Sequence, residues 1–126
     1  MAREIVSTDN APAAIGPYSQ ANKAGGFLYT AGQIPLDPQT MEVVGETAAE
    51  QTRLALTNAK NVVEAGGFTL NDVVKVTVFI MDMGEFAAIN EVYTDFFGAE
   101  PPARSVVEVA RLPKDVLVEI EMIAYR

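Results

Sequence analysis

The chain has 126 residues, of which 49% are hydrophobic and 21% charged, and its excess of acidic side chains gives a net charge of −8. This size and composition predict one core and a single domain spanning residues 1–126, and the charge disfavours binding to nucleic acid or anionic lipid. Cysteine and histidine are absent from the sequence, which excludes disulfides, thiol nucleophiles, serine-histidine-aspartate catalysis and the usual zinc sites. Because the sequence has neither a signal peptide pattern nor an apolar run of the ~18 residues that a membrane helix needs, we predict a cytoplasmic protein.

The first third of the chain is predicted to hold two short strands joined by irregular structure. Residues 3–8 alternate in the manner of a strand. Residues 10–17 contain two prolines and a glycine and are expected to be irregular, with Tyr18 directly after them. Residues 27–34 form the second predicted strand, which begins after a Gly-Gly turn and ends at prolines where a hairpin is plausible.

A long amphipathic helix is predicted from Thr47 to Gly66. Thr47 and Glu50 have the spacing of a capping box, and the Gly-Gly pair at 66–67 is a stop signal. One stripe along this helix is small and apolar, whereas polar and charged residues, Asn58 among them, lie off it. The stripe consists of Ala48, Ala55, Ala59, Val62, Val63 and Gly66.

A strand and a second helix follow. Residues 73–81 alternate, which places Val74, Val76, Val78 and Ile80 on one face. The second helix is predicted to begin at Asp82, which has a glutamate three residues later, and to end at Gly98 before two prolines. Its apolar face consists of Phe86, Ile89, Tyr93, Phe96 and Phe97.

The last two strands are predicted at residues 103–109 and 116–125, joined by a connection of about hairpin length. In the last strand one row of side chains is entirely apolar, and two helices can cover it, which makes the fold class α+β. The other row is Leu117, Glu119, Glu121, Ile123 and Tyr125. It has no predicted partner inside the chain, so we expect a second copy of the subunit to cover it. The alternative is an antiparallel sheet with one half-exposed face.

Arg104 is the first candidate for chemistry. It follows two prolines and an alanine at the start of a strand, which gives it a stiff approach and a regular backbone. Its guanidinium can hold a carboxylate through two parallel hydrogen bonds. The alternative is an ordinary surface salt bridge.

Glu119 is the second candidate. Its apolar neighbours lie on the face that we expect to be an interface, where desolvation would raise its pKa and make it a usable acid or base. One register of the predicted C-terminal hairpin would bring Arg104 and Glu119 to the same face, and the other register would not. A buried pair that only stabilises the interface is the alternative.

Four further residues are candidates for lining a pocket. Tyr18 can offer one hydrogen bond above a pocket, although a tyrosine after Gly-Pro is more often a packing residue. Asn90 is alternatively a solvated helix residue, and Gln33 a residue that forms a hydrogen bond at the end of a strand. Gly32, within a strand pattern, indicates either a bulge or a ligand close to bare backbone. The sequence shows no glycine-rich phosphate motif and no acidic metal cluster, so we expect no cofactor and no metal.

Four segments together resemble the RidA family, also called YjgF. They are residues 10–18 (NAPAAIGPY), 31–35 (AGQIP), 102–115 (PARSVVEVARLPKD) and 118–121 (VEIE), and the likeness extends along the whole chain. The resemblance implies a chorismate-mutase-like α+β fold, with a mixed sheet, two helices on one of its faces, and a homotrimer with clefts between subunits.

The resemblance also implies a function. The family hydrolyses reactive enamines and imines such as 2-aminoacrylate and 2-iminobutanoate to 2-oxo acids and ammonia without a cofactor. Arg104 matches the arginine that grips the substrate carboxylate, and Glu119 the glutamate that positions the attacking water. Tyr18, Gly32 and Asn90 match positions that line the cleft.

Two positions depart from the family pattern. Ala31 stands where many members have serine, and Val106 where many have cysteine, so contacts there would have to come from the backbone. Two other functions are weighed: a regulatory protein that binds 2-oxo acids or similar small metabolites without turnover, and a ribonuclease or translation inhibitor. The charge of −8 and the absence of histidine argue against the ribonuclease.

Overall fold

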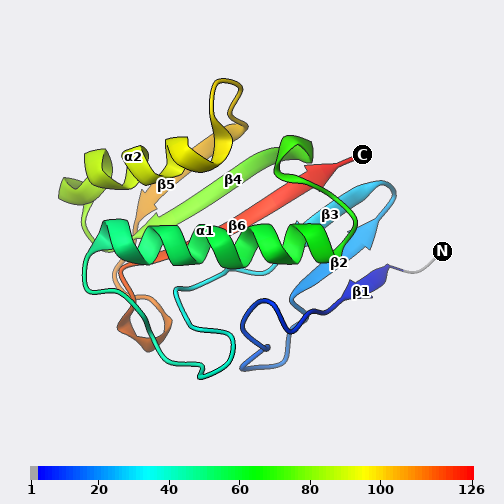
Figure 1. The fold of residues 1–126 in the computed structure, drawn as a ribbon, viewed down its shortest axis with the longest axis horizontal. Helices are drawn as coiled ribbons and strands as arrows, with labels where there is room; N and C mark the ends of the chain where they lie inside the picture. The colour runs from blue at the N-terminus through cyan, green and yellow to red at the C-terminus, as the bar shows by residue number, and fades with distance from the viewer. Residues whose placement is uncertain (1–2) are drawn as a thin grey trace.

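The computed structural model describes residues 3–126 and contains one six-stranded sheet with two helices (Figure 1). The strands are β1 (Glu4–Val6), β2 (Ala21–Ala24), β3 (Phe27–Thr30), β4 (Val73–Ile80), β5 (Ala103–Glu108) and β6 (Val118–Tyr125), and the helices are α1 (Ala48–Ala65) and α2 (Phe86–Phe97). In the described chain neither helix is long and apolar enough to cross a membrane. The α+β class is confirmed, whereas the cytoplasmic location stays a prediction.

Helix α1 begins and ends as its sequence predicts. The Thr47 hydroxyl accepts a hydrogen bond from the Glu50 backbone at 3.1 Å, and the Glu50 carboxylate accepts one from the Thr47 backbone at 3.1 Å, which completes the capping box. Gly66 caps the C-terminal end. Asn58, which we expected off the buried stripe, is only 1% exposed and donates two hydrogen bonds to the carbonyls of Ile34 and Leu36. The helix therefore positions the segment that follows β3.

The alternation predicted for β4 holds after its first residues. An irregularity lies between Val73 and Lys75 in the pairing with β6, so Val73 is buried and Val74 is 45% exposed. The placement of Val74 on the same face as Val76 is therefore wrong, because a bulge shifts the alternation by one residue. Val76, Val78 and Ile80 share one face as predicted, and that face is buried.

The C-terminal strands do not form the predicted hairpin. The strand order is β1-β2-β3-β6-β4-β5, and β5 pairs with β4 in parallel, whereas β6 lies between β3 and β4 and is antiparallel to both. The reason is α2, which connects β4 to β5 and returns the chain to the outer edge of β4. The sheet is mixed, as the family resemblance implied.

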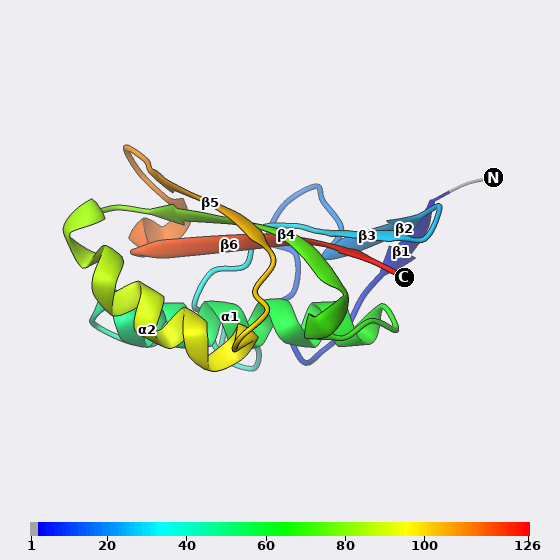
Figure 2. The same ribbon diagram turned by 90° about the horizontal axis from the view of Figure 1, so that it is seen from above.

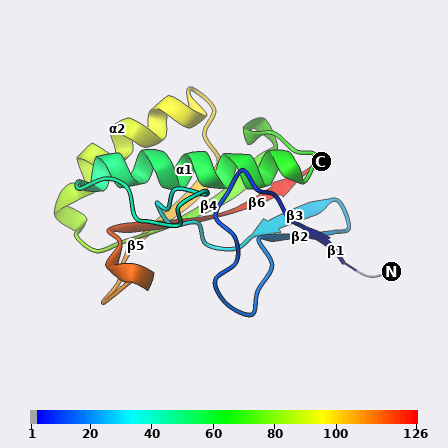
Figure 3. The ribbon, with the colours of Figure 1, turned by 60° about the horizontal axis from the view of Figure 1, so that its bottom comes forward.

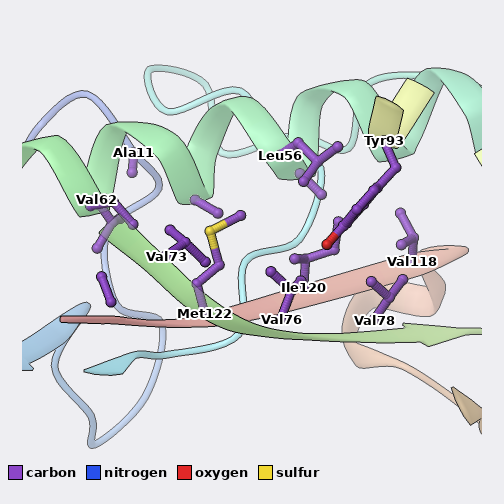
Figure 4. Packing of buried hydrophobic residues seen from close by; sticks show 14 of the residues in the cluster. Ala11, Leu56, Val62, Val73, Val76, Val78, Tyr93, Val118, Ile120 and Met122 are labelled. Atoms are coloured by element: carbon purple, nitrogen blue, oxygen red, sulfur yellow. The ribbon is translucent and has the colours of Figure 1, made fainter. Parts of the chain in front are cut away.

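The core lies between the helices and one face of the sheet. The apolar row of β6 predicted from the sequence is buried, and Val118, Ile120 and Met122 are each at most 1% exposed. Figure 4 shows Leu56 of α1 and Tyr93 of α2 pointing towards these strands. Since burial of one such aliphatic side chain contributes about 1.5–3 kcal/mol, this layer fixes the face that each strand turns inwards.

The opposite face of the sheet is open, because both helices lie on the same side (Figure 2). In the described chain no helix covers this face. Phe27 packs against Tyr125 with their ring centroids 4.7 Å apart, and the Ile5 and Tyr29 side chains are 60% and 45% exposed. An apolar sheet face of this kind is typical of a surface that contacts another protein. We call the surface formed by Ile5, Phe27, Tyr29, Phe79, Val107, Ile123 and Tyr125 the open face.

Candidate functional site

Two separate cavities hold the residues singled out from the sequence. The first, which we call the Arg104 cavity, has a volume of about 390 Å³ and lies between α2 and the start of β5. The second, the Glu119 cavity, has a volume of about 220 Å³ and lies where the chain leaves β3 and passes β6. The Arg104 cavity is lined by Asn90, Tyr93, Thr94, Phe97, Gly98, Pro101, Pro102 and Arg104, and the Glu119 cavity by Ile15, Tyr18, Ala31, Gly32, Ile34, Pro113 and Glu119.

The Arg104 guanidinium is held by one face of α2. It donates a hydrogen bond to the Asn90 side-chain oxygen at 2.8 Å, and its central carbon lies 4.6 Å from the ring centroid of Tyr93 and 5.6 Å from that of Phe86. These three residues fall on one stripe of α2 because of the helical repeat. At the far end of β5, Glu108 accepts a hydrogen bond from the Met83 backbone at 2.7 Å and ties the start of α2 to the strand. The aromatic rings stabilise the cation without neutralising it.

Arg104 has unused capacity to bind an anion. The ion pairs found in residues 3–126 are Lys23 with Glu4, Arg53 with Asp95, Lys60 with Glu64, and Arg111 with Asp115, so Arg104 has no carboxylate partner there. The alternative of an ordinary surface salt bridge is therefore wrong within the described chain. A half-buried guanidinium with most of its N–H groups free is suited to bidentate binding of a carboxylate.

The Glu119 carboxyl group lies against the backbone of Gly32. A Cβ atom added to Gly32 would overlap one carboxyl oxygen of Glu119 and stand only 2.7 Å from its carboxyl carbon. The readings weighed for Gly32 were a bulge and a ligand close to bare backbone, and the group that approaches its backbone in this chain is the side chain of Glu119. The fit fixes where the carboxyl group stands in the cavity.

The surroundings of Glu119 favour its protonated form. Burial raises the pKa of the Glu119 carboxyl above its ordinary value, and the charge of Glu121 two residues along the same strand face raises it further. A carboxyl group whose pKa is raised towards neutral pH can both accept and donate a proton. The expected desolvation of Glu119 is therefore present in the chain.

Arg104 and Glu119 lie on opposite faces of the sheet. Arg104 is in register with Val76 and, through it, with Met122, both of which are buried under the helices. Glu119 is in register with Phe79 and lies on the open face. The hairpin register that would have put both residues on one face therefore does not occur, because β5 pairs with β4 and not with β6. One chain cannot bring these two side chains to the same small ligand.

Comparison with known proteins places the chain in a family. A family model described as Endoribonuclease L-PSP matches residues 8–126. The chain belongs to this family, which is the RidA/YjgF family. A RutC family protein of Pyrococcus horikoshii is 59% identical over 124 residues, with 98% of each chain covered. The 2-iminobutanoate/2-iminopropanoate deaminase of Escherichia coli K12 is 53% identical over 126 residues, also with 98% of each chain covered.

Solved structures of the RidA/YjgF family share this fold. The crystal structure of E. coli TdcF with bound serine has a TM-score of 0.93 to this chain, 51% sequence identity and 98% coverage of both chains. The resemblance found in four sequence segments is therefore confirmed at the level of the family and of the α+β architecture.

Four of the other residues carried over from the family divide between the two cavities, and Val106 lines neither. Tyr18, Ala31 and Gly32 line the Glu119 cavity, and Asn90 lines the Arg104 cavity. Val106, on the same face of β5 as Arg104, packs against the main core. The expectation that any contact with a ligand at this position comes from the backbone stays a prediction.

Sequence reasoning missed two groups of residues that shape the cavities. Tyr93 and Phe86 were read only as the apolar face of a helix, although their rings stack on Arg104. Asn58 and Gln20 were not connected to any site, although both are buried and bond to the backbone of segments that line the Glu119 cavity. A usable signal for Asn58 was its spacing, three residues after Ala55 and four before Val62, which places it on the face of the buried stripe. In the part of the chain that the structure describes, no group of three or more potential metal ligands lies together.

Proposed function

We propose that this chain hydrolyses reactive imines and enamines of small amino acids, such as 2-aminoacrylate and 2-iminobutanoate, to 2-oxo acids and ammonia. The observation that carries the proposal is the half-buried Arg104 guanidinium, which lacks a carboxylate partner in residues 3–126 and lines a cavity of about 390 Å³. Every proposed substrate carries a carboxylate next to the reacting carbon, so a fixed guanidinium both binds the substrate and orients it.

Glu119 is proposed to handle the proton transfers and to position the attacking water. The water oxygen adds to the imine carbon while the carboxylate accepts one water proton, and the electron pair of the C=N bond moves to nitrogen, which takes that proton. The carbinolamine then loses ammonia: its hydroxyl proton passes through Glu119 to nitrogen, the C–N bond breaks and a C=O bond forms. An enamine first becomes an imine by moving one proton from nitrogen to carbon. The raised pKa of Glu119 suits a group that must take and return protons.

The complete site is proposed to form between two copies of the chain. Arg104 lies on the helix side of the sheet and Glu119 on the open face, so each chain would contribute one half of a site to each of two neighbours. The assembly we propose is the homotrimer implied by the family resemblance, with the open faces turned inwards in the chorismate-mutase-like manner. The exposed aromatic and aliphatic side chains of the open face support this arrangement.

The relatives support the chemistry. The E. coli protein named 2-iminobutanoate/2-iminopropanoate deaminase is 53% identical to this chain along nearly its whole length. TdcF was crystallised with serine, a small molecule with the same type of carboxylate next to an amine-bearing carbon. Arg104 and Glu119 are this chain's own residues for the two tasks that the reaction requires.

Ammonia release from a freshly generated imine tests the proposal. A dehydratase supplies the imine, and ammonia is followed with and without the purified protein. We expect release to rise in proportion to the protein and to return to the background rate in Arg104→Ala. Arg53→Ala is the matched control, because it removes another arginine whose ion pair is exposed on the helix layer.

The same experiment separates enzyme from sensor. If the unsubstituted protein binds a 2-oxo acid through Arg104 but ammonia appears only at the background rate, the chain is a metabolite-binding protein and the proposed hydrolysis is wrong. If the Arg104→Ala variant retains the full rate, the proposed role of the guanidinium is wrong.

A further inference from the structure

The loop between β1 and β2 carries one wall of the Glu119 cavity. Ile15 and Tyr18 line this cavity from the loop, opposite Ala31 and Gly32 of the segment after β3. Figure 3 shows this blue segment rising towards α1 after β1 and then projecting past the sheet before it enters β2. The position of the loop therefore decides the shape of the cavity.

The tip of this loop is held weakly by its own packing. Ile15 and Tyr18 are 51% and 46% exposed. The hydrogen bonds at the tip are local: the Ile15 backbone donates to the Tyr18 hydroxyl at 3.2 Å, and the Tyr18 backbone donates to the Gly16 carbonyl at 2.9 Å. These bonds fix the shape of the tip but do not attach it to the sheet, so its placement depends on the base of the loop.

The base of the loop is fastened by the side chain of Gln20. Its amide nitrogen donates to the carbonyls of Pro12 at 2.8 Å, Thr8 at 3.0 Å and Ala11 at 3.3 Å, and its amide oxygen accepts from the Thr8 backbone at 2.7 Å. Gln20 is only 5% exposed. Loss of a buried side chain with this many partners leaves several backbone groups without hydrogen bonds.

The main chain of Gln20 reaches the other wall of the same cavity. Its carbonyl accepts a hydrogen bond from the Ala31 backbone at 2.8 Å, directly before Gly32. The residue thus connects the loop that carries Tyr18 with the segment that packs on the Glu119 carboxyl. A further connection, from the Asn61 side chain of α1 to the Asn10 carbonyl at 2.9 Å, is exposed and lies farther from the cavity.

We propose that Gln20 is a positioning residue for the reaction, which sets the distance between the Ile15–Tyr18 wall and the Gly32–Glu119 wall. The inference rests on the proposed function for its catalytic consequence, but its structural part does not depend on turnover. When the Gln20 side chain is lost, the loop moves, water enters the cavity, and Glu119 and its substrate are no longer enclosed. A displacement of about 1 Å at a catalytic wall lowers the rate by about a hundredfold.

A single tryptophan tests the structural part. The chain contains no tryptophan, so Ala14→Trp, at an exposed position in the loop, gives a unique fluorescence signal. In this background, Gln20→Leu should lower the fluorescence anisotropy of the loop. Thr52→Val is the matched control: it also removes a buried hydrogen bond, from Thr52 to the Ala48 carbonyl at 2.7 Å within α1, and should leave the anisotropy unchanged. If Gln20→Leu does not fold, the second variant is Gln20→Asn, which keeps the amide group on a side chain one methylene shorter.

The titration midpoint of Glu119 is a readout that a general loss of stability would not change. Ile15 and Tyr18 help to exclude water from this carboxyl group, and Glu121 is the charged neighbour on its own strand face. Carbon-13 NMR of the Glu119 side chain should therefore give a lower midpoint in the Gln20 variants than in the wild type, and an unchanged one in Thr52→Val. The specificity constant kcat/KM should fall about ten- to a hundredfold in Gln20→Leu.

The outcomes separate the two proposals. If the anisotropy and the Glu119 midpoint change as stated but even the unsubstituted protein releases no ammonia, Gln20 positions the loop and the proposed hydrolysis fails. If the unsubstituted protein is active and the folded Gln20 variants keep its anisotropy, Glu119 midpoint and kcat/KM, the positioning role is wrong.

Discussion

Gly32→Ala is the substitution that probes the Glu119 cavity with the smallest possible change. The added Cβ would stand 2.7 Å from the carboxyl carbon of Glu119 and 2.9 Å from its Cγ. Carbon atoms in contact are ordinarily about 3.5–4.0 Å apart, so the carboxyl group has to move by about 1 Å. A displacement of that size at a catalytic group lowers the rate by about a hundredfold, which corresponds to about 2.7 kcal/mol in the activation free energy.

The assay is ammonia release from a freshly generated imine, measured for Gly32→Ala and for a control. Gly25→Ala is suitable as the control: Gly25 has φ of +57° in the β2–β3 turn, and its added Cβ would meet no atom within 4 Å. That variant should lose about 1–2 kcal/mol of stability through its left-handed backbone and keep the wild-type kcat. In a Glu119→Ala background, Gly32→Ala should cost no further activity, because the overlapping side chain is gone. Wild-type kcat in Gly32→Ala would refute the reasoning.

Four further predictions address the remaining groups. Arg104→Lys should raise KM about ten- to a hundredfold in steady-state kinetics, since lysine loses the second parallel hydrogen bond to the carboxylate; an unchanged KM would contradict the binding role. Tyr93→Phe should raise the free energy of unfolding by up to about 1 kcal/mol in urea, because the Tyr93 hydroxyl is buried without a hydrogen-bond partner in the described chain; a loss of stability would show that the hydroxyl is used. The folded-state pKa of Glu119 is raised above 4.5, so the contribution of this group to stability is present below pH 4.5 and is lost as the pH rises through the raised pKa. The Glu119→Gln variant should therefore be more stable than the wild type at neutral pH, and its free energy of unfolding in urea should lose this pH dependence. A labelled single-stranded RNA should stay intact with the protein, given the charge of −8; cleavage that persists through purification would favour the ribonuclease reading.

Local signals in the sequence predicted the elements well. The capping box of Thr47 and Glu50 marked the start of α1, because its two reciprocal hydrogen bonds need only residues three apart. The alternation of β6 predicted its buried row, including Ile120 and Met122, because one face of a strand meets the helices and the other does not.

Strand pairing was not predictable from the same signals. The loop after β5 had the length of a hairpin loop, but the hydrogen-bond partner of an edge strand is decided by the packing of the whole sheet, and α2 brings β5 to β4. The sequence left both registers of the predicted hairpin open, and neither applies, because β5 does not pair with β6. The bulge at Val73 and Val74 left no mark in the sequence, because two adjacent valines suit either face of a strand, and the strand β2 carries no β-branched residue to reveal it.

The sequence predicted which residues belong to the site but not how they are arranged in space. Arg104 and Glu119 came from their neighbours in sequence and from the family resemblance, and each now has a cavity of its own. Gln20 gave no signal, because its partners are backbone groups whose proximity exists only after the loop has folded. We propose that a second copy of the chain connects the two cavities, and the sequence of one chain does not describe that arrangement.

Complementation between two inactive variants tests most directly the claim that Arg104 and Glu119 from different copies form one site. Arg104→Ala and Glu119→Gln are each expected to be inactive alone. When the two proteins are unfolded, mixed in equal amounts and refolded together, random assembly of a ring pairs an intact Arg104 with an intact Glu119 at about a quarter of the interfaces. The account predicts recovery of about a quarter of the wild-type activity. If native mass spectrometry shows mixed assemblies and no activity returns, the two residues do not share a site between subunits.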